Sequence, residues 1–164
     1  MLITLGALVL LWKSLPALHI PATQVQQEEA NAQINQPLKI YVPKISKVLN
    51  ITDGYVIDNR WTISENGVSF YTNSASPGGS GNTVIYGHNR RDILGNLEKV
   101  KTGDSVYIVQ ASGNFIKYEI TETKKVEPQQ VEILNQSVEP KLTIYTCSGY
   151  LDQARFVVIA TPVS

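Results

Sequence analysis

The sequence has little of what several common functional sites require. Its 164 residues include one cysteine, Cys147, and two histidines, His19 and His88. A single cysteine excludes an intrachain disulfide and any multi-cysteine zinc site. Two histidines are too few for most histidine-based metal centres, so a metal site would depend almost wholly on carboxylates. We therefore expect a protein that works without a metal or cofactor.

An excess of charge of one sign is also lacking. Fourteen Lys and Arg residues balance fourteen Asp and Glu residues, and the formal net charge is zero. Such a chain has no basic field to attract nucleic acid, which we do not expect as a partner. The charged fraction of 17% is low, but the hydrophobic fraction of 43% is that of a folded protein. The length suits one domain and a short appendage.

Long apolar runs are absent except at the N-terminus. Residues 1–12 are almost entirely apolar, but they are fewer than the roughly 20 residues that a membrane-spanning helix needs. If Lys13 extends toward the membrane interface, residues 14–20 bring the run to about that length. We predict that residues 1–20 form a single-pass N-terminal anchor with the rest of the chain outside the cytoplasm. A cleaved signal peptide and a buried soluble helix are the alternatives.

The rest of the chain divides into a polar segment and a strand-rich domain. Residues 21–37 are rich in Gln, Glu, Asn and Ala, which predicts a linker or a loose helix. Residues 38–164 carry the folded domain, and its β-rich segments are 38–42, 83–86, 105–109, 115–126, 142–146 and 156–160. Only short helices are expected, near 93–100 and 129–134. The pattern predicts an all-β barrel or sandwich of antiparallel strands.

Two of the predicted strands end in side chains that can do chemistry. His88 follows one strand, and Cys147 closes another, where alternation places it on the same face as Thr143 and Tyr145. A loop histidine held by hydrogen bonds and an inert packed cysteine are the simpler interpretations. A lone thiol at a strand end outside the cytoplasm, however, is open to oxidation. This risk favours a catalytic cysteine.

Arg155 opens the strand that follows Cys147 across a short turn. The end of one strand and the start of its antiparallel partner lie side by side, so we expect the guanidinium near the thiol. An ion pair with Asp152 at the sheet edge is the alternative. A fixed cation beside a thiol nucleophile can stabilise an oxyanion or orient a substrate carbonyl. Cys147, His88 and Arg155 together predict nucleophilic catalysis.

These residues lie in segments that resemble a known family. Thr143-Ile144-Tyr145-Thr146-Cys147 resembles the Thr-Leu-x-Thr-Cys signature of the sortases, with Ile144 in place of Leu. Sortases are membrane-anchored cysteine transpeptidases of bacterial, mainly Gram-positive, cell envelopes. Tyr86-Gly87-His88 resembles their histidine segment, and Arg155 stands where their arginine follows the cysteine. The resemblance covers about residues 38–164.

The resemblance implies a fold and an activity. The fold is a closed barrel of about eight mainly antiparallel strands with short helices, preceded by an N-terminal membrane-anchor helix. The enzyme cleaves a Leu-Pro-x-Thr-Gly-like sorting signal on a surface protein and forms a thioester with Cys147. It then transfers the protein to an amine, such as a cell-wall precursor or a pilin lysine. The compact chain resembles class D, E or F enzymes more than the pilin-polymerising class C.

The resemblance also suggests a role for each of the three polar residues. Cys147 attacks the threonine carbonyl as a thiolate, and His88 serves as base and then protonates the leaving amine. Arg155 stabilises the oxyanion or positions the peptide. This chemistry needs no cofactor.

Residues 127–141 form a long connection between two predicted strands, and long loops in small domains are often functional. The connection resembles the loop with which the family reads its sorting signal. We predict that Ile133 and Leu134 wall a pocket for the signal's leucine and proline, and that Thr146 also binds substrate. The alternative is a short helix that buries Ile133 and Leu134 in the core.

Other functions remain open at this point. A non-catalytic extracytoplasmic β-barrel could bind a partner and carry an incidental thiol. A cysteine protease would hydrolyse the peptide without preferring an amine acceptor. An L,D-transpeptidase-like enzyme also uses Cys and His, but its two residues share one short motif, whereas His88 and Cys147 lie far apart in the sequence.

Overall fold

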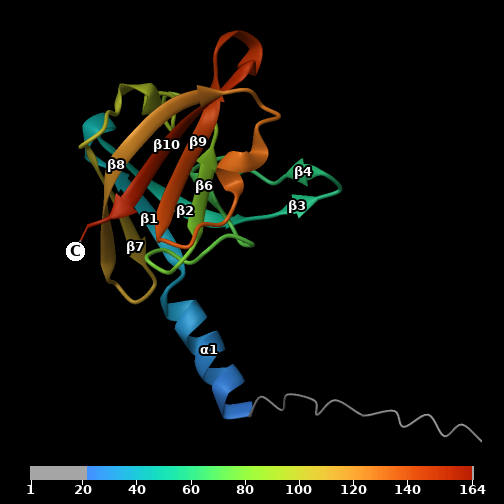
Figure 1. The fold of residues 1–164 in the computed structure, drawn as a ribbon, viewed down its shortest axis with the longest axis vertical. Helices are drawn as coiled ribbons and strands as arrows, with labels where there is room; N and C mark the ends of the chain where they lie inside the picture. Colours follow the sequence, from blue (N-terminus) through green and yellow to red (C-terminus); the bar gives the residue numbers. More distant parts are fainter. Residues whose placement is uncertain (1–21, 164) are drawn as a thin grey trace, which may run out of the picture.

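The computed structural model describes residues 22–163 and consists of a β-barrel with a helix at one end (Figure 1). The helix α1 spans Ala22–Ile34, within the polar segment for which a linker or loose helix is predicted. The predicted anchor, residues 1–20, lies outside the described residues. Within the described part, no helix is long and apolar enough to cross a membrane.

Eight strands form the barrel, a small hairpin stands beside it, and short 3-10 helices fill several connections. The barrel strands are β1 (Pro37–Val42), β2 (Lys47–Gly54), β5 (Val68–Tyr71), β6 (Asn82–Gly87), β7 (Ser105–Gln110), β8 (Phe115–Val126), β9 (Lys141–Ser148) and β10 (Ala154–Pro162). The hairpin consists of β3 (Val56–Ile57) and β4 (Arg60–Trp61). The 3-10 helices are η1 (Pro43–Ile45), η2 (Leu97–Lys99), η3 (Val131–Leu134) and η4 (Tyr150–Asp152).

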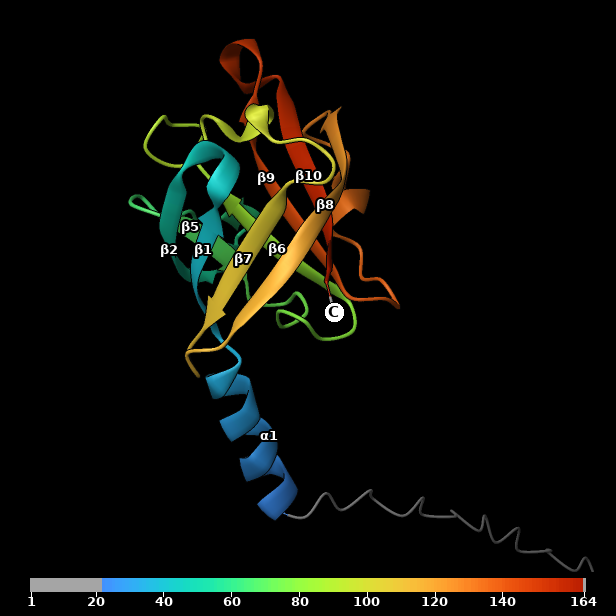
Figure 2. The ribbon, with the colours of Figure 1, turned by 90° about the vertical axis from the view of Figure 1, so that its left-hand side faces the viewer.

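The sheet closes on itself in the order β1-β2-β5-β6-β9-β10-β8-β7, and Figure 2 shows β7, β8 and β10 side by side on one flank. The prediction of a closed, mainly antiparallel barrel is therefore confirmed. Two neighbouring pairs, β2 with β5 and β6 with β9, are parallel. Antiparallel neighbours can be joined by tight turns, whereas parallel neighbours need long crossovers. The β6–β9 crossover contains β7 and β8, so two distant parts of the chain meet there.

Alternation of apolar and polar residues decides which side chains fill the barrel. In β7, Val106 and Ile108 are fully buried, while Tyr107 between them is partly exposed. In β8, Tyr118 and Ile120 are likewise buried. These side chains join one core cluster with residues from the other barrel strands and from the segment around η2. Burial of each such side chain stabilises the fold by about 1.5–3 kcal/mol.

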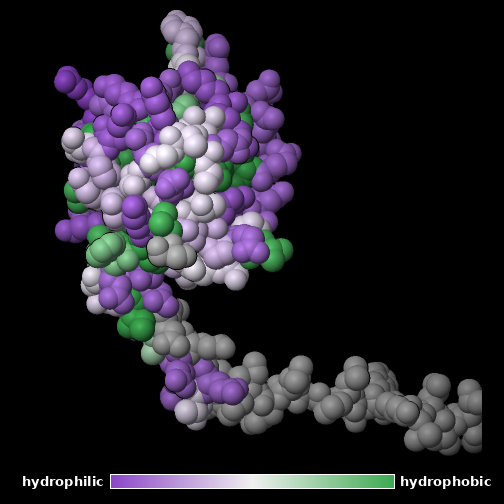
Figure 3. All heavy atoms as spheres, turned by 60° about the vertical axis from the view of Figure 1, so that its left-hand side comes forward, coloured by the Kyte–Doolittle hydropathy of each residue, from purple (hydrophilic) through white to green (hydrophobic). Residues whose placement is uncertain are grey.

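The hairpin between β7 and β8 connects α1 to the barrel. Backbone amides of Ala111 and Ser112 donate to the carbonyls of Gln36 and Ile34, both at 2.9 Å. The side-chain amide of Gln110 donates to the Asn35 carbonyl at 3.2 Å. Figure 3 shows a mainly hydrophilic barrel surface on this face, with apolar side chains gathered where the helix joins it. The C-terminal end of the helix is thus held at the end of the barrel where this hairpin lies.

Candidate active site

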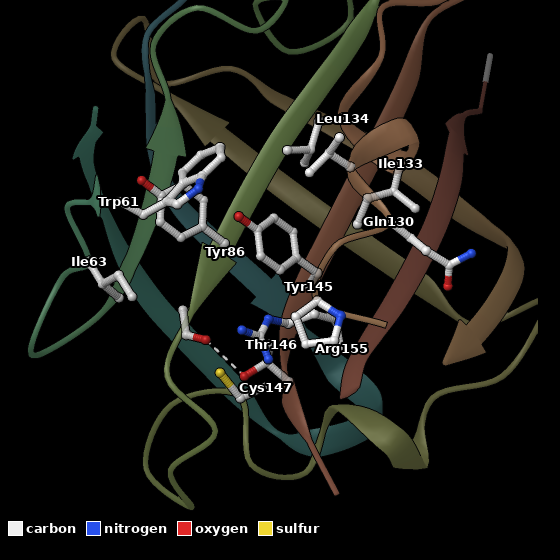
Figure 4. A pocket seen from close by; sticks show the side chains of 13 residues that line it. Trp61, Ile63, Tyr86, Gln130, Ile133, Leu134, Tyr145, Thr146, Cys147 and Arg155 are labelled. Atoms are coloured by element: carbon white, nitrogen blue, oxygen red, sulfur yellow. Dashed lines mark hydrogen bonds between the residues drawn. The ribbon is translucent and has the colours of Figure 1, made fainter. Parts of the chain in front are cut away.

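The two strands that carry the predicted histidine and cysteine are parallel neighbours. The register of β6 and β9 pairs Gly87 with Thr146, and the Thr146 hydroxyl donates to the Gly87 carbonyl at 2.8 Å (Figure 4). Because the strands run in the same direction, the residues that follow this pair, His88 and Cys147, emerge at the same rim of the sheet. The sequence places each residue at a strand end, and the structure makes those two ends adjacent.

Arg155 is the direct partner of Cys147 in the antiparallel register of β9 and β10, as expected from the short turn between them. Its Nη1 donates to the backbone carbonyls of Asp152 at 2.9 Å and Ala154 at 3.0 Å. The ion pairs found among residues 22–163 do not include Arg155 with the Asp152 carboxylate. The edge ion pair considered as an alternative is therefore replaced by bonds to the backbone.

A surface cleft of about 210 Å³ contains most of the predicted site residues. In Figure 4, Cys147, Thr146 and Arg155 lie at one end of it, and the other labelled side chains extend away from them along two sides. The lining residues are Trp61, Ile63, Tyr86, Gly87, Pro128, Gln130, Val131, Ile133, Leu134, Tyr145, Thr146, Cys147 and Arg155. The cleft therefore joins a thiol and a guanidinium to a mainly apolar channel.

His88 is not among the residues that line this cleft. Its side chain is 34% exposed, and its Nε2 lies 3.8 Å from Oε1 of Glu65. The same carboxylate lies 3.7 Å from Nη1 of Arg90, which also pairs with Asp92 at 2.6 Å. The backbone thus brings His88 to the end of β6 beside the end of β9, where an acidic neighbour can interact with its imidazolium form.

The Cys147 thiol is half-buried and free. Burial raises its pKa above the ordinary value, because desolvation disfavours the thiolate; the positive charge of Arg155 lowers it, and Asp152 raises it further. A thiol in this environment is mainly protonated at neutral pH, and only the thiolate is a good nucleophile. Chemistry at Cys147 therefore requires a base nearby, which is the part that the sequence assigns to His88.

Residues 127–140 form one side of the cleft through the 3-10 helix η3. Ile133 and Leu134 lie on this turn, are half-buried and line the cleft, and neither belongs to the core cluster. The short helix considered in the alternative is present, but it does not bury the two side chains in the barrel core. Their position leaves them available to a ligand in the cleft.

Asn82, at the start of β6, is a residue that the sequence pattern does not single out. It is fully buried, and its Nδ2 donates to the carbonyls of Ile133 at 3.0 Å and Asn135 at 3.2 Å. Its Oδ1 accepts from the Thr143 hydroxyl at 2.7 Å. Buried polar groups of this kind stabilise a fold when all their hydrogen bonds are made. Asn82 thereby ties the cleft wall to the barrel.

An aromatic surface lies between the two sides, and the sequence pattern reveals only part of it. Tyr86 and Tyr145 stack with ring centroids 5.5 Å apart, and Trp61 meets Tyr86 edge to face at 5.0 Å. Alternation already places Tyr145 on the face of Cys147, and it could have found Tyr86 in the same way, because Tyr86 precedes His88 by two residues. Trp61 comes from the β3–β4 hairpin, and no pattern links it to the site.

No group of three or more His, Cys, Asp and Glu side chains within residues 22–163 is arranged to hold a metal ion. The chemistry that the cleft offers comes from a thiol, a guanidinium and a neighbouring imidazole. These are the components of covalent catalysis with an activated nucleophile and a cation for a developing oxyanion.

Comparisons with known proteins agree with this arrangement. The chain is 32% identical to sortase A of Listeria monocytogenes over 85 residues. This alignment covers 49% of this chain and 38% of the relative. The chain is 31% identical over 107 residues to sortase D of Bacillus subtilis, covering 65% of this chain and 51% of the relative. The chain thus spans about half or less of the length of these two relatives.

Solved structures resemble the whole barrel. A Clostridium perfringens Sortase D5 transpeptidase has a TM-score of 0.69 and 27% identity, covering 86% of this chain and 89% of that one. Sortase A from Corynebacterium diphtheriae has a TM-score of 0.68 and 31% identity, covering 79% of this chain and 61% of the other. The Sortase domain family model matches residues 40–163. The chain belongs to the sortase family.

Proposed function

We propose that this chain is a cysteine transpeptidase that cleaves a Leu-Pro-x-Thr-Gly-like sorting signal and transfers the acyl part to an amine. One observation carries the proposal: Cys147 and Arg155 face each other at the end of an apolar cleft. The parallel neighbour of the cysteine strand ends at His88. Family membership supports the same chemistry, and the positions of the three side chains are compatible with the roles proposed below.

In the proposed mechanism, His88 accepts the proton of the Cys147 thiol, and the thiolate attacks the threonine carbonyl of the signal. The carbonyl oxygen becomes an oxyanion, to which Arg155 donates after exchanging its bonds with the backbone carbonyls. Collapse breaks the peptide bond, and His88 returns the proton to the departing glycine amine. The remaining thioester is then attacked by an acceptor amine, which forms a new amide and releases the thiol.

The apolar channel provides the binding energy for the signal. Ile133 and Leu134 contact its leucine and proline, and the Tyr86 and Tyr145 rings offer a flat surface on which a proline ring packs. Thr146 lies beside the nucleophile with its hydroxyl already bonded to Gly87, so it contributes mainly through shape. The compact barrel is consistent with a class D, E or F enzyme.

The proposed location is the outer face of a cell membrane, with residues 1–20 as a single-pass anchor and residues 38–164 as the catalytic domain. The 13-residue helix α1 then acts as a spacer of about 20 Å, since an α-helix rises about 1.5 Å per residue. The substrates are surface proteins that carry the signal. The acceptor amine belongs to a cell-wall precursor or to a pilin lysine.

A peptide assay tests the activity. The purified chain is incubated with a panel of sorting-signal peptides, with and without an amine such as triglycine, and the products are identified by mass spectrometry. We expect an acyl-enzyme on Cys147 and an amine-ligated peptide. Hydrolysis with no preference for the amine would instead identify a cysteine protease. Failure of a peptidyl vinyl sulfone to label Cys147 would favour a binding module.

A further inference from the structure

A carboxylate on the far side of the cysteine strand connects three elements of the fold. Ser148, the last residue of β9, is 1% exposed, and its hydroxyl donates to Oε1 of Glu98 at 2.5 Å. The other carboxylate oxygen, Oε2, lies 3.0 Å from Nζ of Lys125 on β8. Glu98 itself belongs to η2. None of these three residues lines the cleft, and the mechanism proposed above uses none of them.

The position of Ser148 makes this contact relevant to the nucleophile. Side chains alternate along a strand, so Ser148 and its neighbour Cys147 point to opposite faces of the sheet. A bond that holds Ser148 therefore fixes the backbone of Cys147 without touching the thiol. The bond between Ser148 and Glu98 restrains the backbone at the point where pairing of the strand stops, because β9 ends at Ser148 and the chain then enters a turn.

Glu98 is also linked along the chain to the segment that carries His88. Leu94 and Leu97, in the segment between them, are buried in the core, and the Leu94 amide donates to the His88 carbonyl at 3.2 Å. Glu98 thus joins the segment after His88 to the strand end that bears Cys147. The hydrogen bond from Ser148, with help from Lys125, holds the pKa of Glu98 below its usual value. The carboxylate stays charged, and charge-assisted hydrogen bonds are about twice as strong as neutral ones.

We propose that Glu98 is a positioning residue that acts through Ser148 and fixes the end of β9, so that Cys147 is held in register with His88. This inference rests on the proposed function, because it assigns Glu98 a part in the same reaction. A displacement of about 1 Å caused by a mutation remote from the reacting atoms can lower a rate about 100-fold. For the loss of this one contact we expect a decrease of about tenfold in kcat.

A double-mutant cycle tests the route through Ser148. Glu98→Ala and Ser148→Ala should each lower kcat about tenfold with KM within about twofold, and the double variant should be no slower than either single one. Glu98→Gln should retain most activity, because its amide carbonyl can still accept from Ser148. Lys125→Met should also be close to wild type, since it leaves that bond intact.

The chain offers a matched control in Glu122, which lies on β8, the strand that also carries Lys125. Its carboxylate lies 3.0 Å from Lys124, and the two side chains are 52% and 40% exposed, against 46% and 56% for Glu98 and Lys125. Glu122→Ala removes a comparable ion pair that makes no bond to Ser148, and it should leave kcat unchanged. The melting temperatures of Glu98→Ala and Glu122→Ala show whether a loss of activity is caused by a loss of stability.

A readout without substrate separates this inference from the proposed function. Backbone amide exchange at residues 147–149 should be faster in Glu98→Ala than in wild type, and unchanged in Glu122→Ala. A wild-type chain with no transpeptidase activity but with this exchange pattern would refute the proposed function and leave the positioning intact. Three results would each overturn the role of Glu98. These are a wild-type kcat in Glu98→Ala, a double variant in which the kcat losses of the two single variants add up, and amide exchange in Glu98→Ala that equals that of the wild type.

Discussion

The floor and the side wall of the cleft are held in place by different means. The floor consists of β6, β9 and β10, where every predicted reacting residue belongs to or adjoins a paired strand. The wall is the segment 127–140, where η3 is held to the barrel by the side chain of Asn82. Regular strands fix side chains more exactly than loops do, and loops tolerate more sequence change. The comparison suggests that the floor carries the reaction and the wall carries the choice of substrate.

The largest expected effect comes from removing the nucleophile on the floor. Cys147→Ala should abolish turnover, because no other cysteine exists in the chain to form a thioester. The barrel should stay folded, since loss of one half-exposed sulfur leaves at most a small cavity. His88→Ala should be nearly as damaging. Mass spectrometry measures the amine-ligated product, and circular dichroism measures the fold; product formed by Cys147→Ala would refute the mechanism.

Arg155 tests whether the floor needs geometry as well as charge. Arg155→Lys keeps the positive charge but not the planar fork of donors, and loss of one oxyanion donor lowers kcat about 100-fold or more. Alkylation of Cys147 by a small uncharged reagent should be largely retained, because the positive charge beside the thiol is kept. If kcat stays at the wild-type value, Arg155 has no catalytic part, and its role is limited to the bonds with the backbone carbonyls of Asp152 and Ala154.

Ile133 and Leu134 test the part of the wall. Either residue changed to Ser should raise KM for the signal peptide about tenfold, the size expected from losing an apolar contact worth about 1.4 kcal/mol. kcat and the melting temperature should change little, because neither side chain is in the core cluster. Val138→Ser is a matched control, since Val138 lies in the same segment and is 87% exposed. An equal loss of folding would show that the two residues serve the core instead.

The sequence predicts the floor better than the wall, for physical reasons. Short apolar strands bounded by turn residues, such as β6, β9 and β10, can be recognised locally, and so can the short turn that brings Arg155 beside Cys147. The parallel pairing of β6 with β9 cannot, because the chain between them folds into two other barrel strands. β2 and β5 are also absent from the predicted strands, since β2 contains Asn50 and Asp53 and β5 has only four residues.

In and around the cleft, the same distinction applies to single residues. His88 and Cys147 are visible because each follows a predicted strand, whereas Asn82 and Trp61 matter through tertiary contacts alone. Asn82 bonds to residues more than 50 positions away, and Trp61 packs on Tyr145 from a separate hairpin. No local pattern of hydrophobicity encodes such contacts. A three-dimensional structure is needed to show how the predicted wall is held to the barrel and which aromatic side chains join it.

The smallest expected effect concerns the charge of Arg155 on the thiol itself. Burial raises the Cys147 pKa, so at neutral pH the thiolate fraction is small and alkylation should be slower than for a free cysteine. The alkylation rate should increase with pH and level off once the pH exceeds the raised pKa of Cys147. The guanidinium of Arg155 lowers the pKa of Cys147, so Arg155→Gln should raise that pKa further. At a fixed pH below the pKa, alkylation of this variant should be about two- to fivefold slower than in the wild type. Arg155→Lys should not show this decrease, because its charge is kept. Alkylation by iodoacetamide, followed by mass spectrometry across a pH series, measures both variants. If the Gln variant reacts as fast as wild type, the guanidinium does not assist thiolate formation, and its contribution to the floor is limited to the oxyanion.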